Sequence, residues 1–182
     1  VEVPTQQIAN KPLVAICMAT YNPRLDLLAR QVTSIQNQTY DNWIVVISDD
    51  CSSPDCFDQM LAIINGDKRF IVSRSETRLG FYRNFERALY MVPEEARFIA
   101  LSDQDDYWHC DKIQTLIAAC TPPFSLAYSD VRLINENGEV LSDTYWTGRR
   151  NNYRNFASLV LANTVSGAAT LFPRSLLNLV LP

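Results

Sequence analysis

Short apolar runs alternate with amphipathic segments along the first two thirds of the sequence. Four such runs have the length of strands and lie at residues 13–19, 43–47, 70–73 and 98–101. The first run has no alternation of apolar and polar residues, which is typical of a parallel strand that is covered on both faces. After the runs, apolar residues recur at helical spacing, most clearly at Ile113, Leu116, Ile117 and Cys120. This alternation predicts an α/β fold, with a mainly parallel central sheet and helices on both faces.

The pattern changes after residue 120. The elements expected there are a strand over 126–134, a turn at 137–138, a hairpin partner over 139–141, a short helix over 156–161 and a strand over 167–172. At the beginning of the first helix, Asn22 and Pro23 are expected to be the N-cap and the first helical residue. The 182 residues fit one domain, 1–182, by the usual size of domains.

Charge and composition exclude several classes of protein. The net charge is -4 and no long basic block occurs, so we expect no nucleic-acid partner. No apolar run approaches the roughly 20 residues that a membrane-spanning helix needs, and the N-terminus lacks the apolar core of a secretory signal. The five cysteines are odd in number and form no CxxC pair, which favours a reducing cytoplasm over a disulfide framework or a structural zinc site.

Polar residues collect in the loops that follow the predicted strands. In an open parallel sheet, ligands bind beyond the carboxyl ends of the strands, where the loops diverge and helix N-termini point their free amides outward. The four loops are residues 20–22, 49–50, 78–84 and 102–106. We therefore expect them to meet at one cleft.

The loop after the fourth strand carries Asp103, Gln104, Asp105 and Asp106. Carboxylates crowded in this way repel one another unless a cation or strong hydrogen-bond donors balance them. Mg²⁺ and Mn²⁺ favour oxygen ligands, and in phosphate chemistry they combine one or two carboxylates with phosphate oxygens and water. The three aspartates are therefore predicted to hold a divalent metal. The alternative is a solvated acidic turn that caps the next helix.

The other loops suggest a nucleotide, although each residue also has a structural interpretation. Asp49 and Asp50 can accept hydrogen bonds from ribose hydroxyls or a base N–H, or they can cap a helix or form an Asx-turn. Tyr21 can stack on a base or pack at the strand end. Arg78 and Arg83 can neutralise a diphosphate or remain solvated.

Other catalytic arrangements receive little support. His109 is the only histidine, and its position beside Trp108, one turn into a predicted helix, favours a structural or exposed role. No GxGxxG or GxxxxGK phosphate loop is present, and no Ser-His-Asp or Cys-His arrangement can be read from the sequence. The convergence of four polar loops, rather than any single residue, therefore carries the prediction of a site.

The order of these motifs resembles the inverting glycosyltransferase family 2, whose members have the Rossmann-like, nucleotide-sugar-binding GT-A fold. The resemblance covers nearly the whole chain and rests on MATYN (18–22), SIQNQTYDNW (34–43), VVISDDCS (45–52), LGFYRNFERAL (79–89), LSDQDDYWHCDKI (101–113) and NTVSGAATLF (163–172). The last two segments are similar to the bacterial rhamnosyltransferase-like branch, whose signature includes Trp108 and Lys112. The resemblance implies a nucleotide-binding half over 13–120 and the start of an acceptor-binding half, truncated at its C-terminus, over 121–182.

The resemblance also implies roles for the cleft residues. The nucleotide-binding residues would be Thr20, Tyr21, Asn22, Asp49, Asp50, Arg83, Asn84, Asp103 and Gln104, and the metal ligands would be Asp103, Asp105 and Asp106. In the family pattern, the first-strand motif lines the nucleoside pocket and Asp50 contacts the base or ribose. Arg83 and Asn84 match the segment near the diphosphate. Asp105 or Asp106 is the implied direct metal contact.

The implied activity is transfer of a sugar from a nucleoside diphosphate sugar, preferably UDP- or dTDP-linked, to a glycan or lipid-linked acceptor with inversion. Mg²⁺ or Mn²⁺ would stabilise the negative charge that develops on the departing diphosphate. Inversion also needs a base at the acceptor hydroxyl, and in similar family members it lies further along the chain, so we expect it beyond Pro182. The expected setting is bacterial surface-polysaccharide synthesis in the cytoplasm, with peripheral association at the inner face of the plasma membrane through segments outside this chain.

Two other classes of protein remain open on the residues alone. A noncatalytic nucleotide-sugar-binding or interaction module would keep the fold without the base. A receiver-like signalling domain also groups acidic residues at strand ends to bind Mg²⁺, but it expects an acidic pair after the first strand and a phosphoacceptor aspartate after the third. Here the segment TYN follows the first strand and the acidic cluster follows the fourth, which places the receiver-like interpretation well below the others.

Overall fold

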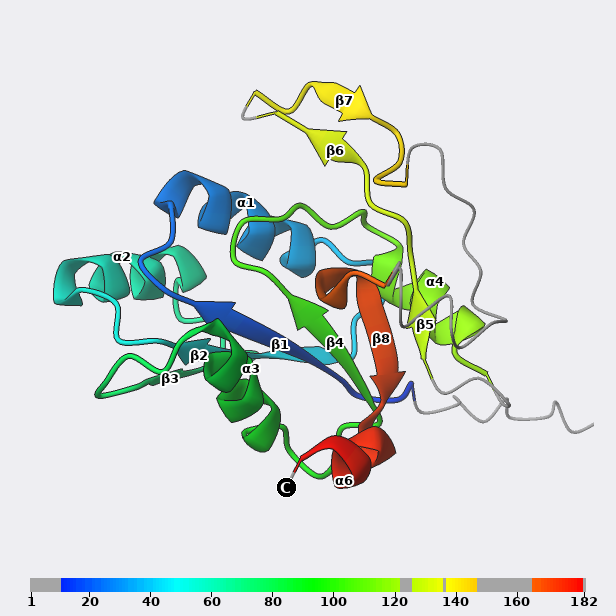
Figure 1. Ribbon diagram of the computed structural model, residues 1–182, viewed down its shortest axis with the longest axis horizontal. Coiled ribbons are helices and arrows are strands. Elements are labelled where there is room, and N and C mark those ends of the chain that lie inside the picture. Colours follow the sequence, from blue (N-terminus) through cyan, green and yellow to red (C-terminus); the bar gives the residue numbers. More distant parts are fainter. Residues whose placement is uncertain (1–10, 122–125, 136, 147–164, 182) are drawn as a thin grey trace, which may run out of the picture.

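The central feature of the computed structural model, which describes residues 11–121, 126–135, 137–146 and 165–181, is a 6-stranded sheet in the order β3-β2-β1-β4-β8-β5 (Figure 1). Its strands are β1 (Val14–Thr20), β2 (Trp43–Asp49), β3 (Phe70–Arg74), β4 (Phe98–Ser102), β5 (Ala127–Tyr128) and β8 (Thr170–Pro173). Strands β1 to β4 pair in parallel, whereas β8 is antiparallel to both β4 and β5. The parallel strands therefore end at one shared carboxyl edge.

Helices cover both faces of this sheet. They are α1 (Leu25–Gln36), α2 (Pro54–Ile64), α3 (Phe81–Tyr90), α4 (Lys112–Ala119) and α6 (Leu177–Val180). In β1, Ile16 and Met18 belong to the apolar cluster formed with α1, α2 and α4, whereas Ala15 and Cys17 belong to the cluster formed with α3 and α6. Because side chains alternate across a strand, one apolar strand can serve both layers. The predicted α/β fold with a mainly parallel sheet is confirmed.

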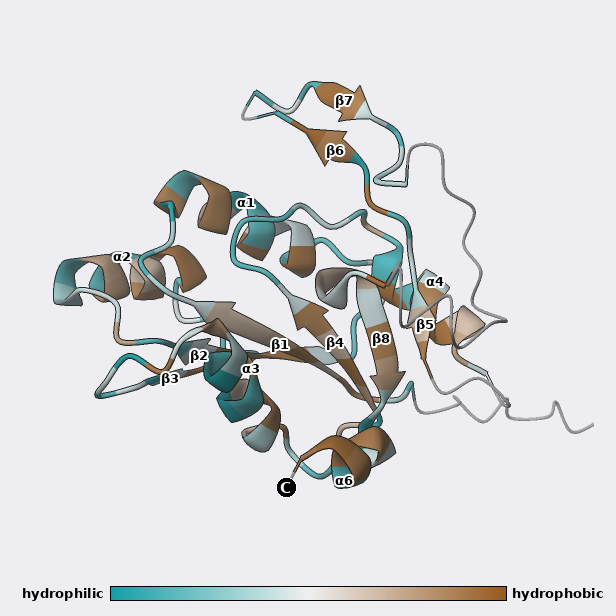
Figure 2. Cartoon of the chain, viewed as in Figure 1, coloured by the Kyte–Doolittle hydropathy of each residue, from teal (hydrophilic) through white to brown (hydrophobic). Residues whose placement is uncertain are grey.

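Hydropathy follows this layering. Val14 to Met18 of β1 are fully buried, and Figure 2 shows β4 in brown and the loop that follows it in teal. The polar groups therefore gather where the apolar strands stop, because the covering helices exclude water from the strands themselves. Within the described ranges, no helix combines the length and the apolar character needed to cross a membrane.

The second part of the chain differs in detail from the sequence-based expectation. The strand expected over 126–134 is two strands, β5 and β6 (Leu133–Ile134), and β6 forms a separate hairpin with β7 (Val140–Ser142). The break occurs around Asp130, whose carboxylate accepts hydrogen bonds from the N–H groups of Val131 and Tyr145 and so turns the chain out of the central sheet. The hairpin itself is confirmed.

Two further expectations concern the region before the C-terminus. The strand expected over 167–172 begins only at Thr170, because residues Gly167–Ala169 form the 3-10 helix η1, in which Ala169 N–H donates to the Ser166 carbonyl. Residues Arg174–Leu176 form a second 3-10 helix, η2. The helix expected over 156–161 lies outside the described residues.

The prediction that Asn22 is the N-cap of the first helix and Pro23 its first residue is wrong. Helix α1 begins at Leu25, with Arg24 in the N-cap position and no side-chain cap. Asn22 instead has a φ of 39°, in the left-handed region that asparagine tolerates. Its Oδ1 accepts from the Ser53 N–H at 2.9 Å, and its own N–H donates to Ser52 Oγ at 2.8 Å. Asn22 therefore ties the loop after β1 to the loop after β2.

Replacing Asp67 with asparagine is expected to destabilise the turn between α2 and β3 in a pH-dependent way. The Asp67 carboxylate accepts from the Arg69 guanidinium at 2.7 and 3.0 Å, and these bonds lower the pKa of Asp67 to about 2. The folded-state pKa lies below the unfolded value, so the stabilisation is present above about pH 4 and is lost as the pH falls towards about 2. Because Arg69 is partly exposed, we expect Asp67→Asn to lower the free energy of unfolding by about 1 kcal/mol at neutral pH. Urea unfolding at pH 7 and pH 3 should show a difference between the two proteins that narrows at the lower pH; a constant difference would contradict this assignment.

Candidate active site

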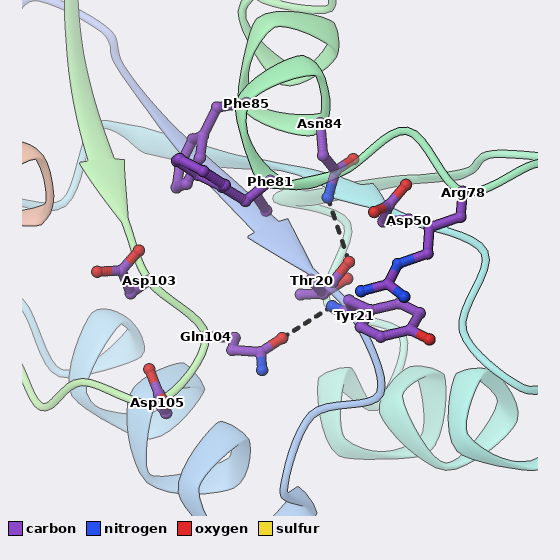
Figure 3. Close-up of a pocket in the computed structure, with 11 residues that line it drawn as sticks. Thr20, Tyr21, Asp50, Arg78, Phe81, Asn84, Phe85, Asp103, Gln104 and Asp105 are labelled. Atoms are coloured by element: carbon purple, nitrogen blue, oxygen red, sulfur yellow. Dashed lines mark hydrogen bonds between the residues drawn. The ribbon is translucent and has the colours of Figure 1, made fainter.

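The loops after the parallel strands meet at a cleft of about 330 Å³, hereafter the carboxyl-edge cleft (Figure 3). It is lined by Ala19, Thr20, Tyr21, Asp50, Arg78, Phe81, Asn84, Phe85, Asp103, Gln104 and Asp105. Most residues predicted for the nucleotide site are among them. Asn22, Asp49, Arg83 and Asp106 were predicted for the site but do not line the cleft.

An aromatic and a cationic side chain form one end of the cleft. The Arg78 guanidinium carbon lies 4.2 Å from the centre of the Tyr21 ring, and both side chains are exposed. The Tyr21 N–H donates to Gln104 Oε1 at 2.9 Å, which links the loop after β1 to the loop after β4. A stacked pair of this kind offers a flat surface to a nucleobase and a charge to a phosphate group.

Asp50 anchors the loop that carries Arg78. Its carboxylate accepts from the backbone N–H groups of Leu79 and Gly80, immediately before α3, and its residue is only 2% exposed. One side chain thus holds both the Arg78 segment and the first turn of α3 against the end of β2. Asp50 lines the cleft while doing so.

Replacing Gly80 with alanine is expected to strain this loop. Gly80 has a φ of 83°, where an L-residue is unfavourable, so the free energy of unfolding should fall by about 1–2 kcal/mol. Gly167→Ala is the matched control, because a Cβ there would lie 3.8 Å from Leu101 Cδ1, an ordinary contact, and its cost should stay within about 0.5 kcal/mol. Urea unfolding of both variants measures the difference. Equal unfolding midpoints for Gly80→Ala and Gly167→Ala would show that position 80 does not require glycine.

Asp49 has a structural role and does not line the cleft. It is fully buried, and its carboxylate accepts from Thr20 Oγ1 at 3.0 Å, from the Ser52 N–H at 2.9 Å and from Ser52 Oγ at 2.5 Å. Arg74 Nε lies 3.7 Å from the same carboxylate. Asp49 therefore fixes the end of β1 and the turn before α2, and these bonds occupy its oxygens.

Asn84 also serves the framework from the wall of the cleft. Its Nδ2 donates to the carbonyls of Ser48 at 2.8 Å and Thr20 at 3.2 Å, and its Oδ1 accepts from Ser48 Oγ at 2.6 Å. These bonds join α3 to the ends of β1 and β2. Its neighbour Arg83 is exposed outside the cleft lining.

The acidic loop after β4 lies at the other end of the cleft. Partial burial raises the pKa of Asp103 to about 6, and the negative charges of Asp106 and Asp105 act in the same direction. The positive charge of Lys112 opposes this shift, and part of the Asp103 residue remains exposed to solvent. Burial likewise raises the pKa of Asp106. The environment of Asp103 and Asp106 therefore disfavours their negative charge, and a bound cation would relieve this effect.

Lys112 is the internal counter-charge of this loop, a position that its spacing in the sequence does not reveal. Its Nζ lies 3.8 Å from the centre of the Trp108 ring and donates to the Ala168 carbonyl at 2.6 Å. Burial lowers the pKa of Lys112 to about 7, against the opposing pull of Asp106 and Asp103. Lys112 thus connects the acidic loop to the segment before β8.

A polar stripe on α1 and its C-terminal turn forms hydrogen bonds with the acidic loop and the residues after it, and the sequence analysis missed it. Gln31 hydrogen bonds with Ser102 Oγ at 2.7 Å, Ser34 Oγ accepts from the Trp108 N–H at 3.0 Å, and Gln38 Nε2 donates to the His109 carbonyl at 2.7 Å. All three α1-side residues are buried. The available signal was polar residues at helical spacing on the otherwise apolar face of α1.

The donor set fits a divalent cation that is shared with a phosphate ligand. In the part of the chain that the structure describes, no three His, Cys, Asp or Glu side chains converge to hold a metal by themselves. Asp103 and Asp105 nevertheless line the same cleft, and Mg²⁺ in phosphate sites needs only one or two carboxylates. The predicted third ligand, Asp106, lies outside the lining, while its charge still acts on Asp103.

A mainly parallel α/β sheet with a carboxylate-bearing cleft at its carboxyl edge is the arrangement expected of the GT-A fold. The sequence profile described as "Glycosyl transferase family 2" matches residues 15–180. The chain therefore belongs to glycosyltransferase family 2.

Curated relatives agree with this assignment. The Escherichia coli proteins WfgD and WfaP, both named as UDP-Glc:alpha-D-GlcNAc-diphosphoundecaprenol beta-1,3-glucosyltransferases, are 31% identical over 129 residues and 36% identical over 107 residues. These matches cover 70% and 58% of this chain, and 49% and 40% of the relatives. Further relatives, from Bacillus subtilis and E. coli, are named for the biosynthesis of teichuronic acid and colanic acid. The chain spans less than half the length of these relatives.

Solved structures confirm the fold. The mannosyltransferase PcManGT of Pyrobaculum calidifontis, solved with GDP-Man and Mn²⁺, aligns with a TM-score of 0.69 at 17% identity and covers 94% of this chain and 47% of its own. The S. aureus protein TarS (residues 1–349), solved with UDP-GlcNAc, aligns with a TM-score of 0.66 at 19% identity and covers 91% of this chain and 46% of its own. At these identities the likeness concerns the fold alone.

Proposed function

We propose that this chain carries the donor-binding half of a glycosyltransferase that transfers a sugar from a UDP- or dTDP-sugar, with inversion, to a glycan or lipid-linked acceptor. The observation that carries the proposal is the cleft itself. It places the Arg78–Tyr21 pair at one end and the carboxylates of Asp103 and Asp105 at the other. A nucleoside diphosphate has a matching arrangement, with a planar base at one end and a metal-binding diphosphate at the other.

The residues divide the work of binding. Tyr21 and Arg78 offer their faces to the base, and Asp50 holds the loop of Arg78 in position. Asp103 and Asp105 would hold Mn²⁺ or Mg²⁺ together with diphosphate oxygens. That cation would supply stabilisation of the negative charge that develops on the leaving diphosphate. Because Gln104 binds the Tyr21 backbone, the two ends of the site are mechanically connected.

Relatives and structural neighbours support the choice of ligands. Two relatives are named as enzymes that use UDP-Glc and a diphosphoundecaprenol-linked acceptor, and PcManGT was solved with a nucleotide sugar and Mn²⁺. We infer the same ligand classes for this protein, in surface-polysaccharide synthesis at the inner face of the plasma membrane. The rhamnosyltransferase-like branch and an acceptor base beyond Pro182 stay predictions.

Calorimetry with UDP, dTDP and GDP, each with and without Mn²⁺, tests the donor site on the chain as it stands. We expect UDP or dTDP to bind, and Mn²⁺ to increase the affinity because it neutralises charge between the diphosphate and the acidic loop. Circular dichroism of the same sample provides the folding control. A folded chain that binds none of the three nucleotides would overturn the proposal.

A further inference from the structure

One wall of the carboxyl-edge cleft is apolar, in contrast to the rest of its lining. Phe81 and Phe85 lie one turn apart on the same side of α3, and both line the cleft. Phe81 is 80% exposed, and neither ring belongs to the two buried apolar clusters of the sheet. Exposed single aromatic residues are common on surfaces. A pair that faces a cleft lined by three carboxylates needs a different explanation.

The position of the pair within the cleft narrows its role. Figure 3 shows the two rings on the Asp103 side of Thr20, away from the Arg78–Tyr21 pair. The proposed base-binding end and the apolar wall are therefore separate parts of the cleft. A nucleotide anchored at Arg78, with its diphosphate at Asp105, would extend its sugar beyond the base-binding end.

We propose that Phe81 and Phe85 form a platform for the C–H face of the donor's sugar ring. Hexopyranose rings present aliphatic hydrogens on one side, and an aromatic ring covers such a surface without competing for hydroxyl hydrogen bonds. The hydroxyl groups would then point to the polar side of the cleft, where Asp103 and Gln104 lie. The exposed area of Phe81 would be buried only when a sugar is present, so the contact contributes to affinity for the nucleotide sugar and not for the nucleotide alone. This inference rests on the proposed function, because it assumes a nucleotide sugar in the cleft.

The chain contains a matched control beside Phe81. Tyr82 is 74% exposed on the same helix but does not line the cleft. Phe81→Ala and Tyr82→Ala therefore remove aromatic rings of similar size and exposure from adjacent positions. Because neither ring is packed in the core, both variants should keep the fold, which circular dichroism checks. Phe81→Tyr retains the ring and should behave as the unsubstituted protein.

Calorimetry with Mn²⁺ should compare UDP with UDP-glucose, or dTDP with dTDP-glucose if the unsubstituted chain prefers dTDP. We expect Phe81→Ala to weaken binding of the nucleotide sugar on the order of 10-fold and to leave the free nucleotide unchanged, with no effect of Tyr82→Ala on either. Equal weakening of both ligands would assign Phe81 to the nucleotide and overturn the inference. Unchanged binding of both ligands to Phe81→Ala would overturn it as well. In each case binding of the free nucleotide to the unsubstituted chain still supports the donor site, whereas its absence would refute the proposed function itself.

Discussion

Replacing Asp49 with alanine is expected to lower the free energy of unfolding by about 3–5 kcal/mol, a large part of the roughly 5–15 kcal/mol that holds a typical domain together. The carboxylate is fully buried and accepts from Thr20 Oγ1 and from both the N–H and the hydroxyl of Ser52. Alanine leaves these donors buried without a partner, and each orphaned donor costs about 1–3 kcal/mol. It also leaves the Arg74 guanidinium, 3.7 Å away, without its counter-charge. Urea unfolding at pH 7 measures the loss.

Two further variants sharpen this test. Asp49→Asn keeps one oxygen acceptor at the same place, so it should lose less stability than Asp49→Ala. Asp58→Ala removes an exposed carboxylate from α2 and should change the free energy of unfolding by less than about 0.5 kcal/mol. If Asp49→Ala were as mild as Asp58→Ala, the structural role assigned to Asp49 would be wrong.

The adjacent residues Asp49 and Asp50 show how far the sequence alone reaches. Strand–helix alternation and the position of the pair at a strand end correctly predict that both lie at the carboxyl edge. Their roles differ because Asp49 is the last residue of β2 and faces Thr20 and Ser52, whereas Asp50 begins the loop and faces the segment before α3. That difference depends on which loop packs beside each carboxylate, and this is a tertiary contact without a local signal.

The four parallel strands were predictable because each contains a continuous apolar run, whereas the parts held by single polar contacts were not. The break of the 126–134 strand depends on Asp130 accepting from residues 14 and 15 positions further along the chain. The acidic loop is anchored by Gln31, Ser34 and Gln38. A search for apolar residues at helical spacing passes over these polar residues. Long-range polar pairing, more than propensity, decided these details.

Replacing Asp105 with asparagine is expected to remove most of the increase in UDP or dTDP affinity that Mn²⁺ provides, a loss on the order of 100-fold at saturating metal. Asparagine has nearly the shape of aspartate, but it lacks the charge that would attract the cation. Asp105 is exposed and lines the cleft, so the substitution should not disturb the fold. Calorimetry with and without Mn²⁺ gives the ratio of the two affinities for each protein.

The metal-free measurement makes this prediction specific. Without Mn²⁺, Asp105→Asn should bind the nucleotide as well as the unsubstituted chain or slightly better, because one negative charge near the diphosphate has been removed. Asp58→Asn, which removes an equal charge from an exposed site on α2 outside the cleft, should leave both affinities unchanged. A nonspecific loss of binding would lower the affinity in both conditions, whereas loss of a metal ligand lowers it only with Mn²⁺. If Asp105→Asn retained the full Mn²⁺ effect, the cation would have to be held elsewhere, and the acidic loop would lose its assigned role.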